Sequence, residues 1–313
     1  MTLKTVLLAA AMALSLGVGL AQSNAGQVRR APAAVSATSD TTGIFNAAAL
    51  GSFFRQLAAT EAHNAHRPVR IMQYGDSHTK ADLFTGAVRR SFQRDFAGDV
   101  YLVAEASHGA AAAGEGQTIL YEALGVNGAR AKRLRALTED ASFLQALARR
   151  KPSLIVLAYG TNEVTDEDWT VESYERMFVE IINRCRAAAP TASVLIVGPP
   201  DRAVRGARGW ASVRRMPELI EAQRRAALSA GAAFWSASDA MGGAGSMNVW
   251  VARGMAQPDH VHFTAAGYSR LGAMFYSDLM NAYRRKQPDT AKPALSDEDL
   301  RFMRGVPITR TPR

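Results

Sequence analysis

Apolar residues occur along the chain in two patterns, as short continuous runs and as positions three or four residues apart. The runs predict buried strands, and the spaced positions predict amphipathic helices. Strands are predicted at 69–74, 100–104, 154–159, 194–197 and 232–236, and helices at 45–57, 79–94, 174–188, 218–228 and 265–285. Because the two kinds of element alternate, we expect an α/β fold on a parallel sheet of about five strands.

The first residues do not follow these patterns. Lys4 precedes an apolar run from 6 to 20, which is short for a membrane span and typical of a secretory signal peptide, assigned here to residues 1–25. Small residues at the −3 and −1 positions allow cleavage after Ala21 or after Ala25. An uncleaved membrane anchor is the alternative. After cleavage we expect a periplasmic or secreted protein without stable membrane insertion.

The rest of the chain divides into three segments. Residues 26–43 are rich in Ala, Ser, Thr and Arg without periodicity, which indicates a flexible linker. Residues 44–285 carry the predicted strands and helices and form one domain, a size typical of a single α/β core. Residues 286–313 are polar and interrupted by prolines, and they are interpreted as a C-terminal tail.

Charge and cysteine content limit the function. The formal net charge is +9 and falls to +8 when Lys4 is removed with the signal peptide. In an exported protein this favours an anionic polymer as partner over nucleic acid. Cys185 is the only cysteine, which excludes an internal disulfide and cysteine-rich metal sites, and no H-E-x-x-H motif is present. We expect Cys185 to pack in the core and no metal or organic cofactor to be required.

The segment from 202 to 215 has a strongly basic composition. It contains Trp210 and five arginines, which are Arg202, Arg205, Arg208, Arg214 and Arg215. A loop of this composition is either a polymer-binding ridge or a solvated helix edge. The sequence leaves both interpretations open.

The most informative stretch is 75–77, Gly75-Asp76-Ser77, which follows the first predicted strand directly. A glycine permits a tight turn, and a serine at a helix start exposes its hydroxyl beside backbone N–H groups without helical partners. This placement suits an acyl-transfer nucleophile. The alternative is that Asp76 or Ser77 only caps the helix.

Later loops contain residues that complement a nucleophile. Gly128 lies between two predicted elements and offers a backbone N–H, and Asn162 follows the strand at 154–159. Asp259 and His262 are three residues apart in a turn, so their side chains can meet, whereas His260 is expected to point elsewhere. The acidic cluster 166–168 suits a helix N-terminus. Together these are the components of a serine acyl hydrolase with an oxyanion hole.

In these residues the sequence resembles the SGNH hydrolases, also called GDSL-type esterases. The four blocks of that family match Gly75-Asp76-Ser77, Gly128, Gly160-Thr161-Asn162 and Asp259-x-x-His262, and the resemblance covers about 69–279. It implies a three-layer α/β/α sandwich, Ser77 as nucleophile, His262 as base and Asp259 as the residue that orients it. It also implies an oxyanion hole made by the N–H groups of Ser77 and Gly128 and the amide of Asn162.

Within that family, 75–79, 125–129 and Gly198-Pro199-Pro200-Asp201 look most like the exported peptidoglycan O-acetylesterases and similar carbohydrate acetyl esterases. His78 stands where the GDSL name has leucine, and no extra β-rich carbohydrate module is evident. The resemblance implies a serine esterase that removes acetyl groups from an extracytoplasmic polysaccharide, O-acetylated peptidoglycan in particular. The alternatives are a general short-chain esterase, lipase or thioesterase, and a non-catalytic polysaccharide-binding protein.

Overall fold

The computed structural model describes residues 43–96, 100–102 and 119–286. The predicted signal peptide, 1–25, lies outside these ranges. The predicted linker also lies outside them except for its last residue, 43, and so does the predicted tail except for its first residue, 286. None of the helices in the described ranges is long and apolar enough to cross a membrane.

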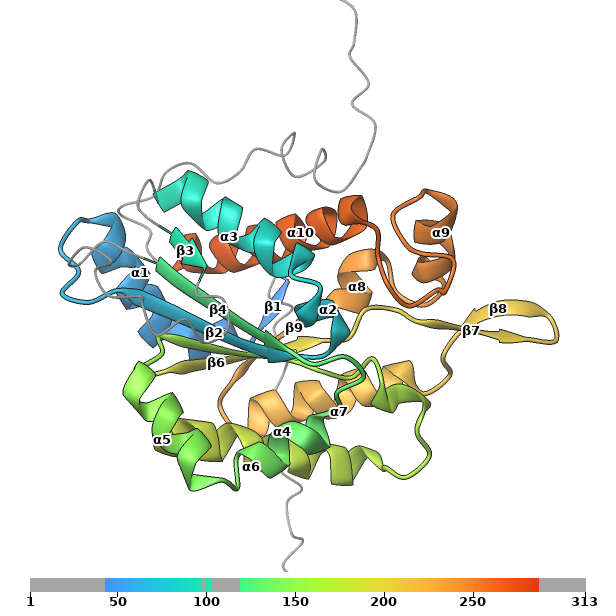
Figure 1. The fold of residues 1–313 in the computed structure, drawn as a ribbon, viewed down its shortest axis with the longest axis horizontal. Coiled ribbons are helices and arrows are strands. Elements are labelled where there is room, and N and C mark those ends of the chain that lie inside the picture. The colour runs from blue at the N-terminus through green and yellow to red at the C-terminus, as the bar shows by residue number, and fades with distance from the viewer. Residues whose placement is uncertain (1–42, 97–99, 103–118, 287–313) are drawn as a thin grey trace, which may run out of the picture. The chain divides into compact units, whose positions relative to one another are not determined.

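A seven-stranded sheet forms the centre of the fold, in the order β1-β9-β6-β5-β2-β4-β3 (Figure 1). Six strands are parallel, and the two-residue β1 at the edge pairs antiparallel with β9. The strands are β1 (Ile44–Phe45), β2 (Val69–Gly75), β3 (Val100–Leu102), β4 (Ile119–Gly125), β5 (Leu154–Ala158), β6 (Ser193–Gly198) and β9 (Ala233–Ser236). The predicted α/β class with a mostly parallel sheet is confirmed.

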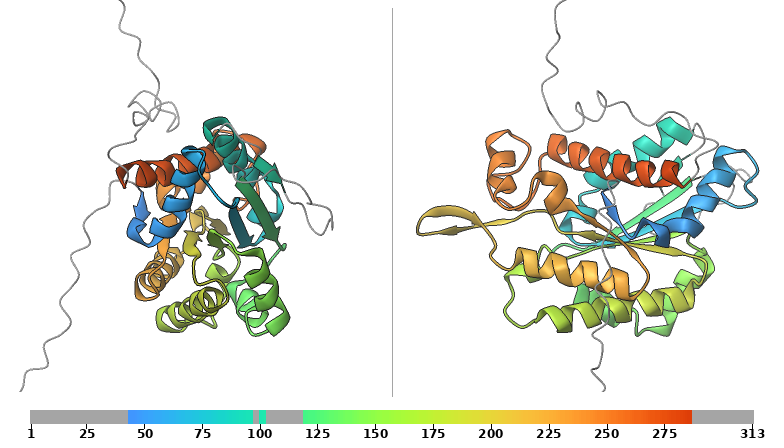
Figure 2. Two further views of the ribbon diagram at one scale, coloured as in Figure 1. Left: turned by 90° about the vertical axis from the view of Figure 1, so that its left-hand side faces the viewer. Right: turned by 180° about the vertical axis from the view of Figure 1, so that it is seen from behind.

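Helices cover both faces of the sheet and complete three layers (Figures 1 and 2). One face packs on α1 (Gly51–Glu61), α3 (Leu83–Phe96), α8 (Ala237–Met241), α9 (Ser246–Ala252) and α10 (Ala265–Arg285). The other packs on α4 (Ala131–Leu137), α5 (Ala141–Arg150), α6 (Val171–Ala188) and α7 (Met216–Ser229). The remaining helical segments are short, namely η1 (Ala47–Leu50), α2 (Ser77–Lys80) and η2 (Glu163–Thr165).

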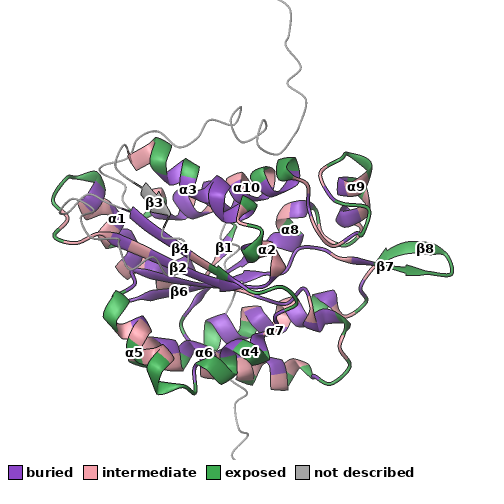
Figure 3. Cartoon of the chain, in the orientation of Figure 1, coloured by how far each residue is buried: buried purple, intermediate pink, exposed green. Residues whose placement is uncertain are grey.

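The continuous apolar runs of the central strands follow from this sandwich. In β5, Leu154 and Val156 belong to the core on one face, and Ile155 and Leu157 belong to the core on the other. Successive side chains of a strand point to opposite faces, so a strand covered on both sides needs apolar residues at every position. The buried sheet between two helical layers is visible in Figure 3.

Strand β4 was not predicted, which is why the expected sheet had too few strands. It pairs with β2 along its whole length, from Val69 opposite Ile119 to Gly75 opposite Gly125. Gly125 ends the strand beside α2. A Cβ at Gly125 would lie 2.1 Å from the backbone nitrogen of Lys80. The glycine therefore allows the close approach of α2.

Two other segments differ from the prediction. The 202–215 segment is no loop or helix edge, because it contains the hairpin of β7 (Ala203–Gly206) and β8 (Gly209–Ser212). The acidic cluster at 166–168 does not start a helix. Helix α6 begins at Val171 with Thr170 as its N-cap, and Asp166 forms an ion pair with Arg130 instead.

Cys185 is fully buried on α6 and packs in the core, as predicted. Burial raises the pKa of its thiol to about 12, because the thiolate is disfavoured away from water. The thiol is therefore protonated and unreactive at neutral pH.

Candidate active site

Ser77 is the first residue of α2 and follows the central strand β2 after a single residue, Asp76. Asp76 is the N-cap, and its Oδ1 accepts a hydrogen bond of 2.9 Å from the backbone N–H of His78. Gly75 allows a tight turn because it has no side chain. A Cβ at this position would lie 2.1 Å from Thr79 Oγ1. Capping is thus done by Asp76, and the Ser77 hydroxyl is left for another partner.

That partner is His262, which lies 185 residues further along the chain. Ser77 Oγ is 3.0 Å from His262 Nε2, and His262 Nδ1 is 2.8 Å from Asp259 Oδ2. A carboxylate only accepts hydrogen bonds, so Nδ1 carries a proton and Nε2 is left to accept from the serine hydroxyl. The three side chains form a continuous relay from carboxylate to hydroxyl.

The carboxylate of Asp259 also fixes the loop that carries the imidazole. Its Oδ1 accepts hydrogen bonds of 2.9 Å from the backbone N–H groups of Val261 and His262. Burial disfavours ionisation of this carboxyl, but the hydrogen bonds from His262 and Val261 and the nearby imidazole outweigh it, so its pKa is lowered. Asp259 is therefore ionised at neutral pH.

His260 points away from Ser77, as expected, and is buried. Its Nδ1 lies 2.9 Å from Asn248 Oδ1, and its ring stacks on Trp210 at 3.9 Å between centroids and 12° between planes. Its backbone has a positive φ of 56°. His260 thus holds the 253–264 loop against the β7–β8 hairpin.

Gly128 and Asn162 are brought together on neighbouring loops. Gly128, at φ 70°, is the third residue of a turn closed by a hydrogen bond of 3.0 Å from Ala129 N to Val126 O. Asn162 follows β5, and its Nδ2 donates to Ala129 O at 2.9 Å. An amide nitrogen has two hydrogens, so a second donor is left.

The Gly128 turn is also tied to the strand that leads to Ser77. Val126 N donates to Gly75 O at 3.1 Å. Strands β4 and β5 pair with β2 on either side, so their following loops flank the serine at the carboxyl edge of the sheet.

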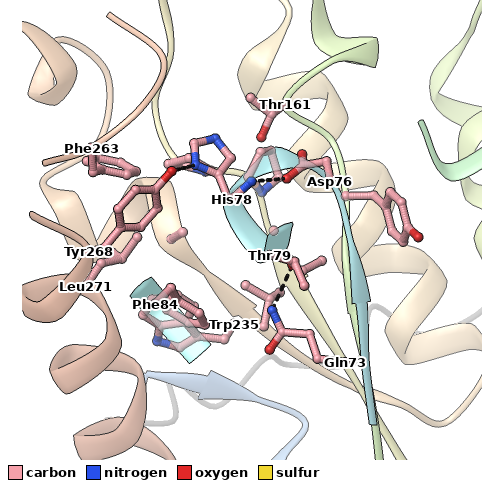
Figure 4. Close-up of a pocket in the computed structure, with 17 residues that line it drawn as sticks. Gln73, Asp76, His78, Thr79, Phe84, Thr161, Trp235, Phe263, Tyr268 and Leu271 are labelled. Atoms are coloured by element: carbon pink, nitrogen blue, oxygen red, sulfur yellow. Dashed lines mark hydrogen bonds between the residues drawn. The ribbon is translucent and has the colours of Figure 1, made fainter. Parts of the chain in front are cut away.

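A partly buried histidine beside the relay, His78, was not assigned a role from the sequence. His78 Nδ1 lies 2.9 Å from the Tyr268 hydroxyl (Figure 4). The ring centroid of His78 is 5.4 Å from that of His262. Burial lowers the pKa of His78 to about 3, and the neighbouring His262 adds to the effect. His78 is thus neutral and adds no charge beside His262. The only sequence signal was its position directly after Ser77.

Asp76 and His78 line a cavity of about 40 Å³ together with Thr161 and Tyr268. Burial raises the pKa of Asp76 to about 6. Hydrogen bonds from the His78 backbone N–H and the Thr161 side chain favour the carboxylate and partly oppose this increase. Across the same region Arg202 Nη1 donates to Thr161 O at 2.6 Å. The hairpin base is thereby joined to the loop that carries Asn162.

An activated hydroxyl, an imidazole held by a carboxylate and adjacent amide donors define the serine hydrolase class. The family model of the GDSL-like lipase/acylhydrolase family matches residues 74–270, which include all of these residues. The chain belongs to this family and is a hydrolase of carboxylic esters.

Solved structures show the same fold. A peptidoglycan O-acetylesterase superposes with a TM-score of 0.65 at 22% identity, covering 75% of this chain and 96% of its own. A protein described as a GDSL-like lipase from Parabacteroides merdae ATCC 43184 superposes with a TM-score of 0.50 at 15% identity, covering 70% and 99%. No curated protein matches the chain.

Proposed function

We propose that the protein is a serine esterase that removes O-linked acetyl groups from an extracytoplasmic polysaccharide, O-acetylated peptidoglycan. The observation that carries the proposal is the relay from Asp259 through His262 to Ser77, at 2.8 Å and 3.0 Å. The glycan specificity is supported by the residues at 75–79, 125–129 and 198–201, and the fold is shared with a peptidoglycan O-acetylesterase. The predicted signal peptide supports export to the compartment of such a substrate.

The reaction follows from the geometry in two steps. Ser77 Oγ attacks the acetyl carbonyl while His262 Nε2 takes the hydroxyl proton, and the alcohol of the sugar then leaves with that proton. Water attacks the acetyl-serine with the same imidazole as base and releases acetate. Asp259 holds the Nδ1–H and stabilises the imidazolium without accepting its proton.

The negative oxygen formed in each step needs donors. Ser77 is the first residue of a helix, so its backbone N–H has no partner within that helix. In the proposal this N–H, the N–H of Gly128 and the amide of Asn162 form the oxyanion hole. Each donor is typically worth about 10²–10³-fold in turnover.

Acetate release tests the proposal. The purified mature protein and its Ser77→Ala variant are incubated with O-acetylated peptidoglycan, with the same material after alkaline removal of the esters, and with acetylated xylan. We expect acetate only from the ester-bearing polymers, faster from peptidoglycan than from xylan, and none with Ser77→Ala. Equal rates on the two polymers would overturn the peptidoglycan assignment.

A general esterase or lipase is the second candidate, because the family includes lipases and other acylhydrolases. A series of p-nitrophenyl esters from acetate to decanoate separates the two functions. The proposal predicts the highest kcat/KM for acetate. A higher kcat/KM for the long chains would favour the lipase. A folded protein without turnover of any ester would favour a non-catalytic polysaccharide-binding protein.

A further inference from the structure

The β7–β8 hairpin extends away from the body of the molecule (Figures 1 and 2). Its two strands pair with each other from Ala203 opposite Ser212 to Gly206 opposite Gly209, and neither pairs with the central sheet. Most of its residues are exposed, as Figure 3 shows. A projecting ribbon of this kind contributes little to the core, so its residues are open to another role.

The base of the hairpin is nevertheless fixed to the loops of the active site. Asp201 is fully buried, and its Oδ2 accepts hydrogen bonds from Ser212 Oγ at 2.9 Å and from Met247 N at 3.0 Å. Ala203 N donates to His260 O at 3.1 Å, two residues before His262. The Arg202 contact with Thr161 O joins the base to the loop of Asn162. The hairpin thus starts at the edge of the active site.

Trp210 presents an aromatic surface on this hairpin. One face of its indole stacks on His260, and its backbone oxygen accepts a hydrogen bond of 3.0 Å from Asn248 Nδ2. The residue is still 37% exposed. A large aromatic ring held by stacking and open to solvent is a typical surface for contact with the apolar face of a sugar ring.

The charges of the hairpin are all of one sign. Residues 202–215 contain no Asp or Glu. The side chains of Arg205, Arg208 and Arg214 are exposed and make no hydrogen bond or ion pair with any residue in the described ranges. By contrast, Arg130, the N-cap of α4, is paired with Asp166, and Arg135 on α4 is paired with Glu180. Arg205 and Arg208 of the hairpin, and Arg214 just after it, are therefore available to an external anion.

We propose that the β7–β8 hairpin is a binding arm for an acidic glycan strand. Trp210 contacts a sugar ring, Arg205 and Arg208 contact carboxylates along the strand, and the acetylated sugar is thereby placed at Ser77. The inference rests on the proposed function and extends it, because it assigns the recognition of the polymer to residues outside the catalytic relay. A small aryl ester does not reach the arm.

Kinetics with a polymer and a small ester test the arm. The double variant Arg205→Gln/Arg208→Gln is compared with the charge-preserving Arg205→Lys/Arg208→Lys. The matched control is Arg90→Gln/Arg149→Gln, which removes two exposed arginines from α3 and α5. Substrates are solubilised O-acetylated peptidoglycan, neutral acetylated xylan and p-nitrophenyl acetate, each between about 20 and 500 mM salt.

If the hairpin is a binding arm, Arg205→Gln/Arg208→Gln should lose about fivefold in kcat/KM on peptidoglycan, mostly through an increase in KM. The rates of this variant on xylan and aryl acetate should be like those of the wild type. Salt should slow the wild type on peptidoglycan, because exposed charges are screened over about 10 Å at 0.1 M, and the Gln variant should respond less. An equal loss in the control, or unchanged kinetics and salt response in the Gln variant, would overturn the arm.

Trp210 is tested by Trp210→Phe and Trp210→Ala. Phenylalanine keeps an aromatic ring on His260, so it should retain most of the peptidoglycan activity, whereas alanine should raise KM for both polymers. An increase in KM on aryl acetate equal to that on the polymers would show that Trp210 only supports the His260 loop, and would overturn its role in the arm.

Binding separates failure of the arm from failure of the proposed function. The Ser77→Ala protein is sedimented with insoluble peptidoglycan whose esters have been removed, with and without Arg205→Gln/Arg208→Gln. Loss of co-sedimentation in the triple variant Ser77→Ala/Arg205→Gln/Arg208→Gln supports the arm even if the wild type releases no acetate. Equal co-sedimentation overturns the arm even if acetate is released. Binding to anionic lipid vesicles or RNA, with none to peptidoglycan, would also overturn it.

Discussion

Asp259 contacts His262 with both of its carboxylate oxygens. Oδ2 lies 2.8 Å from Nδ1 of the imidazole, and Oδ1 accepts a hydrogen bond of 2.9 Å from the backbone N–H of the same residue. The first contact selects the tautomer whose Nε2 accepts from Ser77, and the second fixes the turn that places the ring. One side chain therefore sets both the protonation and the position of the proposed base.

Replacing Asp259 by Asn separates these two effects. The amide oxygen still accepts from the backbone N–H groups of the turn, but the amide nitrogen no longer accepts from Nδ1–H. We expect kcat on p-nitrophenyl acetate to fall about 10⁴-fold at pH 7, with the melting temperature nearly unchanged. A loss below tenfold would contradict the role of Asp259.

Substitutions of the two histidines in the 253–264 loop should have different effects. His262→Ala removes the base and should lower kcat by more than about 10⁴-fold with little change in stability. His260→Ala removes a buried ring that stacks on Trp210, and should lower the free energy of unfolding by about 1–3 kcal/mol with a much smaller loss of turnover. Chemical denaturation and aryl acetate kinetics on both variants check this. Equal losses of turnover would mean that the base has been misassigned.

The oxyanion hole gives a third prediction. Asn162→Ala should lower kcat about 10²–10³-fold, because it removes a donor for the negative oxygen. Gly128→Ala is the control. It keeps its backbone N–H, and its Cβ meets no atom within 4 Å, so only the positive φ should cost stability, about 1–2 kcal/mol. In steady-state kinetics kcat should therefore fall in Asn162→Ala and stay near that of the wild type in Gly128→Ala, with thermal unfolding recorded for both, and a similar loss of kcat in the two variants would contradict the assignment of Asn162.

Acid should destabilise the protein through His78. The pKa of this imidazole is lowered from 6.5 to about 3 by burial, so the unfolded chain binds the proton first and stability is lost as the pH falls below 6.5. Each pH unit costs about 1.4 kcal/mol, or about 2 kcal/mol by pH 5. In urea unfolding, the wild type should lose about 2 kcal/mol more than His78→Asn between pH 7 and pH 5. Parallel losses would show that His78 is protonated in the folded protein.

Local sequence features predicted the parts of the site that depend on neighbouring residues. A glycine after an apolar run predicted the turn before Ser77, and a spacing of three predicted the contact of Asp259 with His262. The last helix was predicted at 265–285, and α10 has these bounds, with Thr264 as the N-cap that accepts from Gly267 N. Each of these features depends on side chains within a few residues of one another.

Features that depend on distant partners were missed. Strand β4 contains Glu122, a poor strand residue whose burial is compensated by ion pairs with Arg70 and Arg150, both outside the strand. The hairpin is held by Asp201, which contacts Ser212 and Met247. Neither arrangement has a periodic pattern, so hydrophobic periodicity alone does not reveal it.

The most direct test of the account is to identify the residue that forms the covalent adduct with a fluorophosphonate, a reagent that labels activated serines. The wild type is incubated with the reagent and its mass and peptide map are recorded, with Ser77→Ala and His262→Ala in parallel. We expect one adduct per chain, located on Ser77, with aryl acetate turnover lost as the adduct forms, no adduct in Ser77→Ala and much slower labelling in His262→Ala. An adduct on another residue, or full ester turnover after stoichiometric labelling of Ser77, would contradict the account.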